Sequence, residues 1–289
     1  MPLTELRVHT SRAFALLLAS WLLAWPGGAS ARDVVIAGGI EGRTYQRYAA
    51  NLGSKLPAFK VRYRQTAGSS ENLDLLAAGE VDIGFAQVDV FATRIRSERE
   101  RFEKLGIVGR LADECVFLAY RKGGSVTSEE GLQAQVDGRK PKLSVGDPQG
   151  GMHTTWLLLK EIQPAFGATA IDFTGGTLAL NHLATGMLDA VGWVTDPRNH
   201  DHKLLRAVFA NDSLDILEID DPSLAYTLPQ GTVVYELKEV SISRGMRPRK
   251  ITTVCTGSAV FARPGIEPRL MDAVSDVLSL DREAILSLD

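Results

Sequence analysis

The sequence has few of the residues that mark specialised classes of protein. Only two of its 289 residues are cysteines and only 12 are prolines, which excludes a disulfide-stapled miniprotein and a collagen-like chain. Neither sign of charge dominates, because 32 basic and 35 acidic side chains give a net charge of −3. No overall positive field would therefore concentrate nucleic acid or an anionic membrane surface, and we expect no nucleic-acid partner. Hydrophobic residues make up 45% of the chain, which is typical of a packed globular protein.

Motifs for cofactors and catalysis are missing as well. The sequence has no G-x-x-x-x-G-K-[ST], and its glycine-rich stretch 37–45 lacks the G-x-G-x-x-G spacing of a dinucleotide site. It has no G-x-S-x-G and no H-E-x-x-H. His200 and His202 have the spacing of a metal-ligand pair, but their polar surroundings indicate a solvated loop. We therefore expect no catalytic residue, no cofactor and no metal site.

The one long apolar run lies near the N-terminus, at residues 13–25. It follows basic residues and precedes Ala29-Ser30-Ala31, which is the pattern of a cleaved secretory signal. A membrane anchor is the alternative, but the run is short against the roughly 20 residues that span a bilayer. We expect residues 1–31 to be a signal peptide and the mature chain to begin near Arg32 in the periplasm.

The two cysteines, Cys115 and Cys255, lie in apolar runs that resemble strands. Export permits a disulfide between them, and two buried free thiols are an equally good interpretation.

Strand and helix signals alternate along the mature chain. Residues 44–56 place apolar side chains on one face of a helix, and residues 71–78 predict a second helix with Ser69 or Ser70 as its N-cap. Strands are predicted at residues 34–36, 59–63 and 81–86. This order is typical of a parallel sheet covered by helices.

The sequence also repeats. Residues 76–89 align with residues 183–196 at an offset of 107, and residues 34–44 align with residues 143–153 at an offset of 109. The repeat predicts an α/β fold with two similar lobes, each with a central, mostly parallel sheet flanked by helices.

Two apolar strands would join these lobes as hinges, at residues 115–121 and 254–263. The chain would then leave the first lobe and later return to it. The expected lobes are residues 32–121 plus 255–289, and residues 122–254.

Three glycine-rich loops would follow strands of the two lobes, at residues 37–45, 66–71 and 146–154. Glycines let the backbone approach a ligand, and exposed N–H groups at helix N-termini favour a carboxylate or other small anion. The alternative is that these residues only make turns and helix caps. If the loops bind a ligand, we expect its polar ends to meet Arg43 and the hydroxyls of Thr44, Ser69, Ser70 and Thr154. Tyr45 or Trp193 would cover its apolar part.

The first two loops and the segment after them resemble a known family. The motifs are Ile36-Ala37-Gly38-Gly39 with Gly42-Arg43-Thr44-Tyr45, then residues 66–73, then residues 76–89. They are similar to those of the TAXI-type solute receptors of TRAP transporters. The resemblance implies a type II periplasmic binding protein fold with a ligand cleft between the lobes. It also implies capture of a small organic acid or amino acid, such as glutamate or a dicarboxylate, for a membrane permease.

The resemblance and the loops together give a set of candidate ligand-binding residues. Those that match the family motifs are Gly39, Thr44, Tyr45, Gly68, Ser69, Gln87, Asp89 and Gly151. Those added from the loops and their surroundings are Arg43, Ser70, Gln149, Gly150, His153, Thr154 and Trp193.

The expected protein is thus a monomeric solute receptor that partners the permease subunits of a TRAP transporter. A periplasmic sensor that signals to a membrane protein is the alternative. An exported enzyme that uses Glu41, Asp89 or His153 is less favoured.

Overall fold

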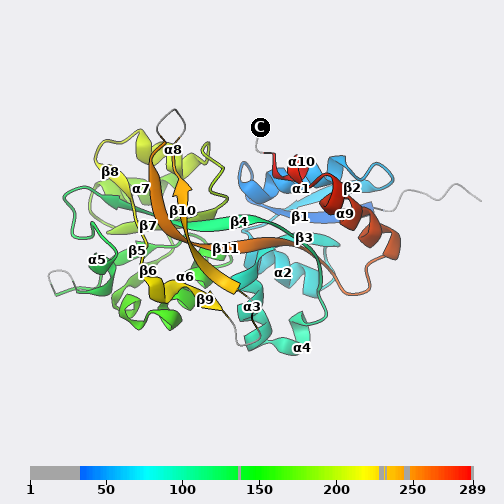
Figure 1. Ribbon diagram of the computed structural model, residues 1–289, viewed down its shortest axis with the longest axis horizontal. Coiled ribbons are helices and arrows are strands. Elements are labelled where there is room, and N and C mark those ends of the chain that lie inside the picture. The colour runs from blue at the N-terminus through cyan, green and yellow to red at the C-terminus, as the bar shows by residue number, and fades with distance from the viewer. Residues whose placement is uncertain (1–32, 136–137, 228–230, 232, 244–247, 288–289) are drawn as a thin grey trace, which may run out of the picture. The chain divides into compact units, whose positions relative to one another are not determined.

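The computed structural model describes residues 33–135, 138–227, 231, 233–243 and 248–287 (Figure 1). The expected signal peptide, residues 1–31, lies outside the described residues. The residues from 33 onward pack as one unit, in which the parts of both lobes belong to one sheet. None of the helices in the described ranges is long and apolar enough to cross a membrane.

The first lobe begins with the predicted alternation of strands and helices. Its elements are β1 (Asp33–Gly39), α1 (Thr44–Ser54), β2 (Lys60–Gln65), α2 (Ser69–Ala77) and β3 (Ile83–Gln87). The strands are parallel in the order β2-β1-β3. Helix α1 buries Tyr45, Tyr48 and Leu52 in the core of this lobe, as its apolar face predicts.

The N-cap of α2 differs from the prediction. Gly68 occupies the N-cap, and Ser69 and Ser70 are the first residues of the helix, so neither serine is the cap. Gly68 has φ 136° and ψ −146°, a conformation that residues with a Cβ atom rarely adopt. The expected serine cap is wrong because the chain enters this helix through a backbone conformation that favours glycine.

The second lobe repeats this arrangement. Its elements are β5 (Lys142–Ser144), α6 (Gly151–Ile162), β6 (Ala170–Asp172), α7 (Gly176–Ala184) and β7 (Ala190–Thr195). The strand order β7-β5-β6 mirrors β3-β1-β2. Ile36 pairs with Ile83 and Leu143 pairs with Ala190, so both partners are offset by 107 residues. The offset of 109 expected for the first strand is wrong, because it aligned loop glycines at the expense of strand register.

Two aspartates of the repeat explain part of its sequence. Asp82 accepts a hydrogen bond from the backbone N–H of Val35 at 2.9 Å, and Asp189 accepts one from that of Lys142 at 2.8 Å. Each aspartate lies directly before a strand, Asp82 before β3 and Asp189 before β7. Each ties the start of that strand to the neighbouring strand, β1 or β5. The matching residues are again 107 positions apart, which indicates that these aspartates are conserved between the lobes for structural reasons.

Two long strands, β4 (Gly106–Arg121) and β11 (Lys250–Ala262), run antiparallel across the middle of the molecule (Figure 1). β11 pairs with β3, and β4 pairs with β7, so the two lobes share one sheet. On β4, Leu111 packs in the first-lobe core and Cys115 in the second-lobe core; on β11 the change falls between Cys255 and Ala259. The lobe boundaries expected at residues 121 and 255 stay a prediction.

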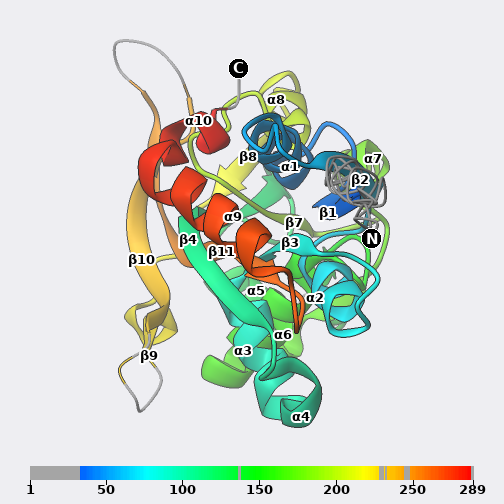
Figure 2. The same ribbon diagram turned by 90° about the vertical axis from the view of Figure 1, so that its right-hand side faces the viewer.

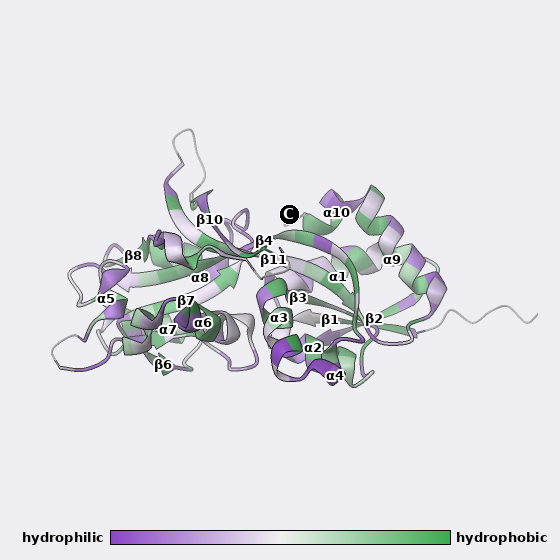
Figure 3. Cartoon of the chain, turned by 60° about the horizontal axis from the view of Figure 1, so that its bottom comes forward, coloured by the Kyte–Doolittle hydropathy of each residue, from purple (hydrophilic) through white to green (hydrophobic). Residues whose placement is uncertain are grey.

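The remaining strands belong to the same sheet, and the remaining helices lie around it (Figure 1). Helices α9 (Pro268–Leu280) and α10 (Arg282–Leu286) lie on the first lobe, with α9 against β4 (Figure 2). Helix α9 carries both hydrophobic and hydrophilic residues (Figure 3), and its buried face consists of Leu270, Val274 and Leu278. The other elements are α3 (Val88–Ser97), α4 (Arg99–Phe102), α5 (Glu130–Gln133), α8 (Lys203–Phe209), β8 (Leu214–Leu217), β9 (Tyr226–Thr227), β10 (Val233–Ser241) and the short turns η1 (Pro164–Ala168) and η2 (Pro222–Leu224).

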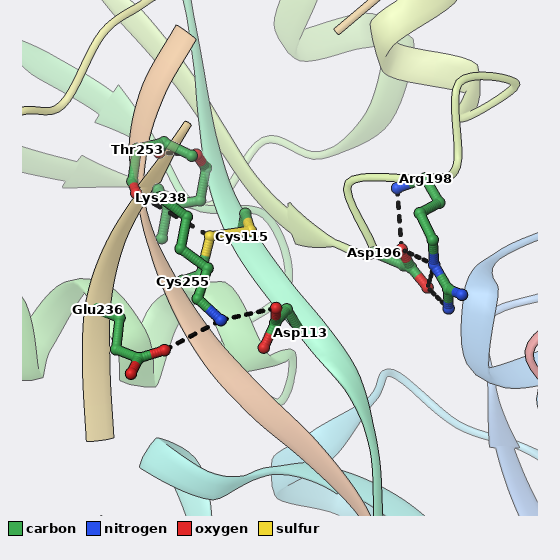
Figure 4. Close-up of a disulfide and its surroundings, with 9 residues drawn as sticks. Asp113, Cys115, Asp196, Arg198, Glu236, Lys238, Thr253 and Cys255 are labelled. Atoms are coloured by element: carbon green, nitrogen blue, oxygen red, sulfur yellow. Dashed lines mark hydrogen bonds and ion pairs between the residues drawn. A yellow bond between two sulfur atoms is a disulfide. The ribbon is translucent and has the colours of Figure 1, made fainter. Parts of the chain in front are cut away.

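Cys115 and Cys255 form a disulfide between the two crossing strands (Figure 4). They are directly opposite each other in the β4–β11 register, and both are buried. Of the two interpretations that the sequence left open, the structure has the disulfide and not the pair of free thiols.

Candidate functional site

A cavity of about 270 Å³ lies where the two parallel units face each other. Its walls come from the loops after β1, β2, β5 and β6, from the end of β3, from most of β7, from the start of α8 and from the middle of β4. This is where ligands bind in open α/β sheets, beyond the carboxyl ends of the strands. All three glycine-rich loops predicted from the sequence contribute to it.

Four helices begin at the cavity. The N-cap residues of α1, α2, α6 and α7 are Arg43, Gly68, Gly150 and Gly175, and all four line the wall. None of these caps has a side chain that accepts a hydrogen bond from the helix backbone. The first N–H groups of each helix and the positive ends of four helix dipoles are therefore concentrated around one small space, which favours a negatively charged group.

The packing of the loops requires glycine at one position in particular. A Cβ atom on Gly151 would lie 1.6 Å from Oε1 of Gln87, so a side chain there would displace the glutamine. Gln87 is held by two hydrogen bonds: its Oε1 accepts from Ser69 at 3.1 Å, and its Nε2 donates to Thr155 at 3.1 Å. The close approach of α6 to the end of β3 thus fixes the Gln87 amide beside the cavity.

The structure brings ten of the predicted residues together at the cavity. They are Gly39, Arg43, Thr44, Tyr45, Gly68, Ser69, Gln87, Gly150, Gly151 and Trp193. The other five, Ser70, Asp89, Gln149, His153 and Thr154, are not part of its wall.

Four of these five make contacts in the loops and first helical turns around the cavity. The hydroxyls of Ser70 and Thr154 lie 3.2 Å apart and join α2 to α6. Gln149 is exposed, and its carbonyl accepts from the backbone N–H of Glu71 at 3.4 Å. Nδ1 of His153 lies 3.2 Å from the carbonyl oxygen of Pro148.

Asp89, the fifth, is fully buried behind the cavity. Its Oδ2 accepts from the hydroxyls of Tyr235 at 2.6 Å and Thr155 at 2.7 Å, and its Oδ1 accepts from the backbone N–H of Val90 at 2.7 Å. Burial raises the pKa of Asp89, and these three hydrogen bonds oppose the shift. The carboxyl group thus anchors both lobes beneath the site.

Asp196, in the second lobe, also joins the two lobes through its carboxyl group. Its Oδ2 accepts from the hydroxyl of Tyr48 at 2.7 Å, and Arg198 pairs with it at 2.7 Å (Figure 4). The hydroxyls of Thr44 and Thr195 also lie 2.9 Å apart across the lobes. The two lobes are therefore in direct polar contact around the cavity.

Glu114 is a wall residue that sequence reasoning missed. It lies on β4, is 4% exposed, and burial raises its pKa to about 8. A hydrogen bond from Tyr45 opposes the shift, while the charges of Asp196 and Asp89 add to it. Its Oε1 has no hydrogen-bond partner in the part of the chain that the structure describes. The signal available in the sequence was the two-residue period of a strand, which places Glu114 on the same face of β4 as Val116 and Leu118, whose side chains are buried.

His202 is the second residue that was missed. The sequence placed it in a solvated loop, but it is buried and lines the cavity, so that interpretation is wrong. Its ring stacks on Trp193 with centroids 5.8 Å apart, and Trp193 in turn stacks on Phe117. Burial and the positive charge of Arg43 lower the pKa of His202 to about 4, so its imidazole is neutral at pH 7. Packing against this aromatic stack removes the side chain from water.

The cationic side of the cavity is Arg43. Its guanidinium is half-buried, and burial lowers its pKa while the nearby charge of Asp147 opposes the change. In the described part of the chain, no group of three or more His, Cys, Asp or Glu side chains could hold a metal ion. The site therefore offers hydrogen-bond donors, one cation and one buried carboxyl group to a ligand.

Comparisons with solved structures identify the fold. No protein family matches the chain, and no curated protein matches it. Among solved structures, a putative L-cystine ABC transporter protein from Listeria monocytogenes is 14% identical, with a TM-score of 0.53 over 88% of this chain and 92% of that one. A structure described for glutathione import via GshT and the cystine ABC importer TcyBC of Streptococcus mutans is also 14% identical, with a TM-score of 0.52 over 89% and 92%. The chain has the two-lobed α/β fold of type II periplasmic solute-binding proteins.

Proposed function

We propose that the protein is an extracytoplasmic solute-binding protein that encloses a small organic acid or amino acid between its lobes. The convergence of four uncapped helix N-termini on one cavity carries this proposal. Such N-termini bind anions, and Arg43 adds a full positive charge beside them. The fold supports the proposal, since proteins with this fold close around solutes by hinge motion.

The size of the cavity limits the ligand. A volume of about 270 Å³ lies just below the usual range for ligand pockets, which suits a molecule the size of glutamate or a short dicarboxylate. The apolar part of such a ligand would contact Tyr45 and Trp193, and its carboxylate would lie against the helix N-termini. No catalytic step is needed for this function.

Delivery to the permease of a TRAP-type transporter is the finer part of the proposal. It rests on the resemblance of residues 36–45, 66–73 and 76–89 to TAXI-type receptors. The signal-peptide pattern of residues 1–31 supports export to the periplasm, where the receptor would meet the permease. The two solved structures named above are described with ABC transporters, and their likeness to this chain is one of fold.

Ligand binding can be tested with the protein purified as residues 32–289. A ligand that binds only the native state raises the melting temperature, so a library of carboxylates and amino acids is screened by thermal shift. Mass spectrometry of small molecules released from the freshly purified protein identifies any ligand carried through purification.

Arg43→Ala tests the site itself. Loss of a charged hydrogen bond costs about 1.5–3 kcal/mol, so we expect affinity for the selected acid to fall at least about tenfold. The control is Arg62→Ala, which removes an exposed arginine of β2 that lies outside the cavity. Unchanged melting temperatures across the whole library would refute the proposal.

A further inference from the structure

Glu114 is an unusual group to find in a cavity built to attract anions. Its side chain is 4% exposed, and Tyr45 donates a hydrogen bond to the carboxyl group, but Oε1 has no partner among the described residues. Thr256, opposite Glu114 on β11, has a buried hydroxyl that likewise lacks a partner in the described part of the chain, so it does not satisfy Oε1. A buried carboxyl oxygen with no donor costs free energy, so a donor from a ligand would stabilise it.

Several hydrogen-bond donors surround the cavity. Four helix N-termini and Arg43 line this space, and Nε1 of Trp193 has no acceptor among the described residues. The second carboxylate of the wall, Asp147, is exposed and accepts from the backbone N–H of Gln149 at 2.8 Å. Glu114 is therefore the buried acidic group of a wall that otherwise recognises negative charge.

We propose that Glu114 binds the ammonium group of the solute, so that the solute is an amino acid and not a dicarboxylate lacking nitrogen. The carboxylate of the same molecule lies against the helix N-termini and Arg43. This inference rests on the proposed solute-binding function and narrows its ligand class. One positive and one negative group on the ligand match one buried acid and one cluster of donors on the protein.

The surroundings of Glu114 couple this binding to a proton. Tyr45 and Tyr48 on α1, Asp89 at the start of α3 and Asp196 after β7 are the titratable groups that interact with it. With its pKa raised to about 8, Glu114 is protonated at pH 7 when no ligand is bound. An arriving ammonium group favours the carboxylate, so the proton leaves Glu114 for the buffer as the ion pair forms. Affinity for an amino acid should consequently rise from pH 6 to pH 8.

Matched ligand pairs test the proposal in the wild-type protein. L-glutamate is compared with glutarate, and L-alanine with propionate, because each pair differs by the amino group. Isothermal titration calorimetry at pH 7, in two buffers of different ionisation enthalpy, gives affinity and the number of protons exchanged. We expect one amino acid to bind at least about tenfold more tightly than its partner and to release close to one proton.

Glu114→Gln then identifies the group responsible. It should weaken amino acid binding at least about tenfold and abolish proton release, whereas the control Asp113→Asn, at an exposed neighbour paired with Lys238, should change neither. Equal binding of glutarate and glutamate, with no effect of Glu114→Gln, would overturn this inference and leave the solute-binding function standing. Binding of none of the four compounds, together with a flat library screen, would overturn both.

Discussion

The hydroxyl of Tyr48 in the first lobe donates a hydrogen bond to Asp196 in the second lobe, with 2.7 Å between the oxygens. An equivalent bond runs in the other direction, because the hydroxyl of Thr155 in the second lobe donates a hydrogen bond to Asp89 in the first, also with 2.7 Å between the oxygens. Tyr48 and Thr155 are 107 positions apart, as are Asp89 and Asp196, so the internal repeat places two equivalent bonds across the lobe interface. Opening of the lobes must break both.

Tyr48→Phe should therefore favour an open form. It removes one of the two reciprocal bonds, and a buried hydrogen bond contributes about 1 kcal/mol, so we expect about a fivefold loss of ligand affinity. Small-angle X-ray scattering of the ligand-free variant should give a larger radius of gyration than that of the wild type. The control is Tyr63→Phe, since Tyr63 is 53% exposed. Identical scattering and affinity for both variants would show that the Tyr48–Asp196 bond does not hold the lobes together.

The stability of the ligand-free protein should depend on pH through two buried groups with opposite signs. His202 has its pKa lowered to about 4, below its unfolded value, so its contribution is present above about pH 6.5 and is lost as pH falls through 4. Glu114 has its pKa raised to about 8, so its contribution is present below about pH 4.5 and is lost as pH rises through 8.

Two variants separate these contributions in urea unfolding at pH 4.5, 6.5 and 8.5. His202→Phe keeps a ring stacked on Trp193 and should reduce the loss of stability from pH 6.5 to 4.5. Glu114→Gln should reduce the loss from pH 6.5 to 8.5. If either variant keeps the pH profile of the wild type, the corresponding group is not the source of that dependence.

Gly151→Ala should damage the site more than the fold. The added Cβ displaces Gln87 from Ser69 and Thr155, which leaves buried polar groups unpaired at a cost of about 1–3 kcal/mol. We expect at least about a fivefold loss of ligand affinity by calorimetry, with the secondary structure intact by circular dichroism. Gly167→Ala is the matched control, because its Cβ would meet nothing within 4 Å. Equal affinities of the two variants would contradict the positioning of Gln87 by α6.

The local parts of the fold could be predicted from the sequence, because periodicity and helix caps depend on near neighbours. The alternation from β1 to β3 and the apolar face of α1 follow this rule. The full length of β4 could not be predicted in this way. It begins at Gly106, well before the apolar run at Cys115, because pairing with the distant β11 holds its half-exposed first part.

In the candidate site, too, features set by near neighbours could be predicted and features set by distant elements could not. The glycine loops were visible because Gly39 and Gly68 need backbone conformations with positive φ. Glu114 and His202 were not, because the burial of a polar residue depends on which distant elements cover it. Ser70 follows Ser69 in sequence, but each helical residue turns by about 100°, so Ser70 faces Thr154 of α6 and not the cavity.

The disulfide between Cys115 and Cys255 also determines how the chain is connected. The cysteines are 140 positions apart, and the chain between them contains β5, β6, β7 and β8 with the helices that flank them. Most of the second lobe is thus a covalently closed ring attached to the first lobe. A protease that cuts one loop of this ring leaves a single molecule under non-reducing conditions, and only reduction of the disulfide separates two fragments.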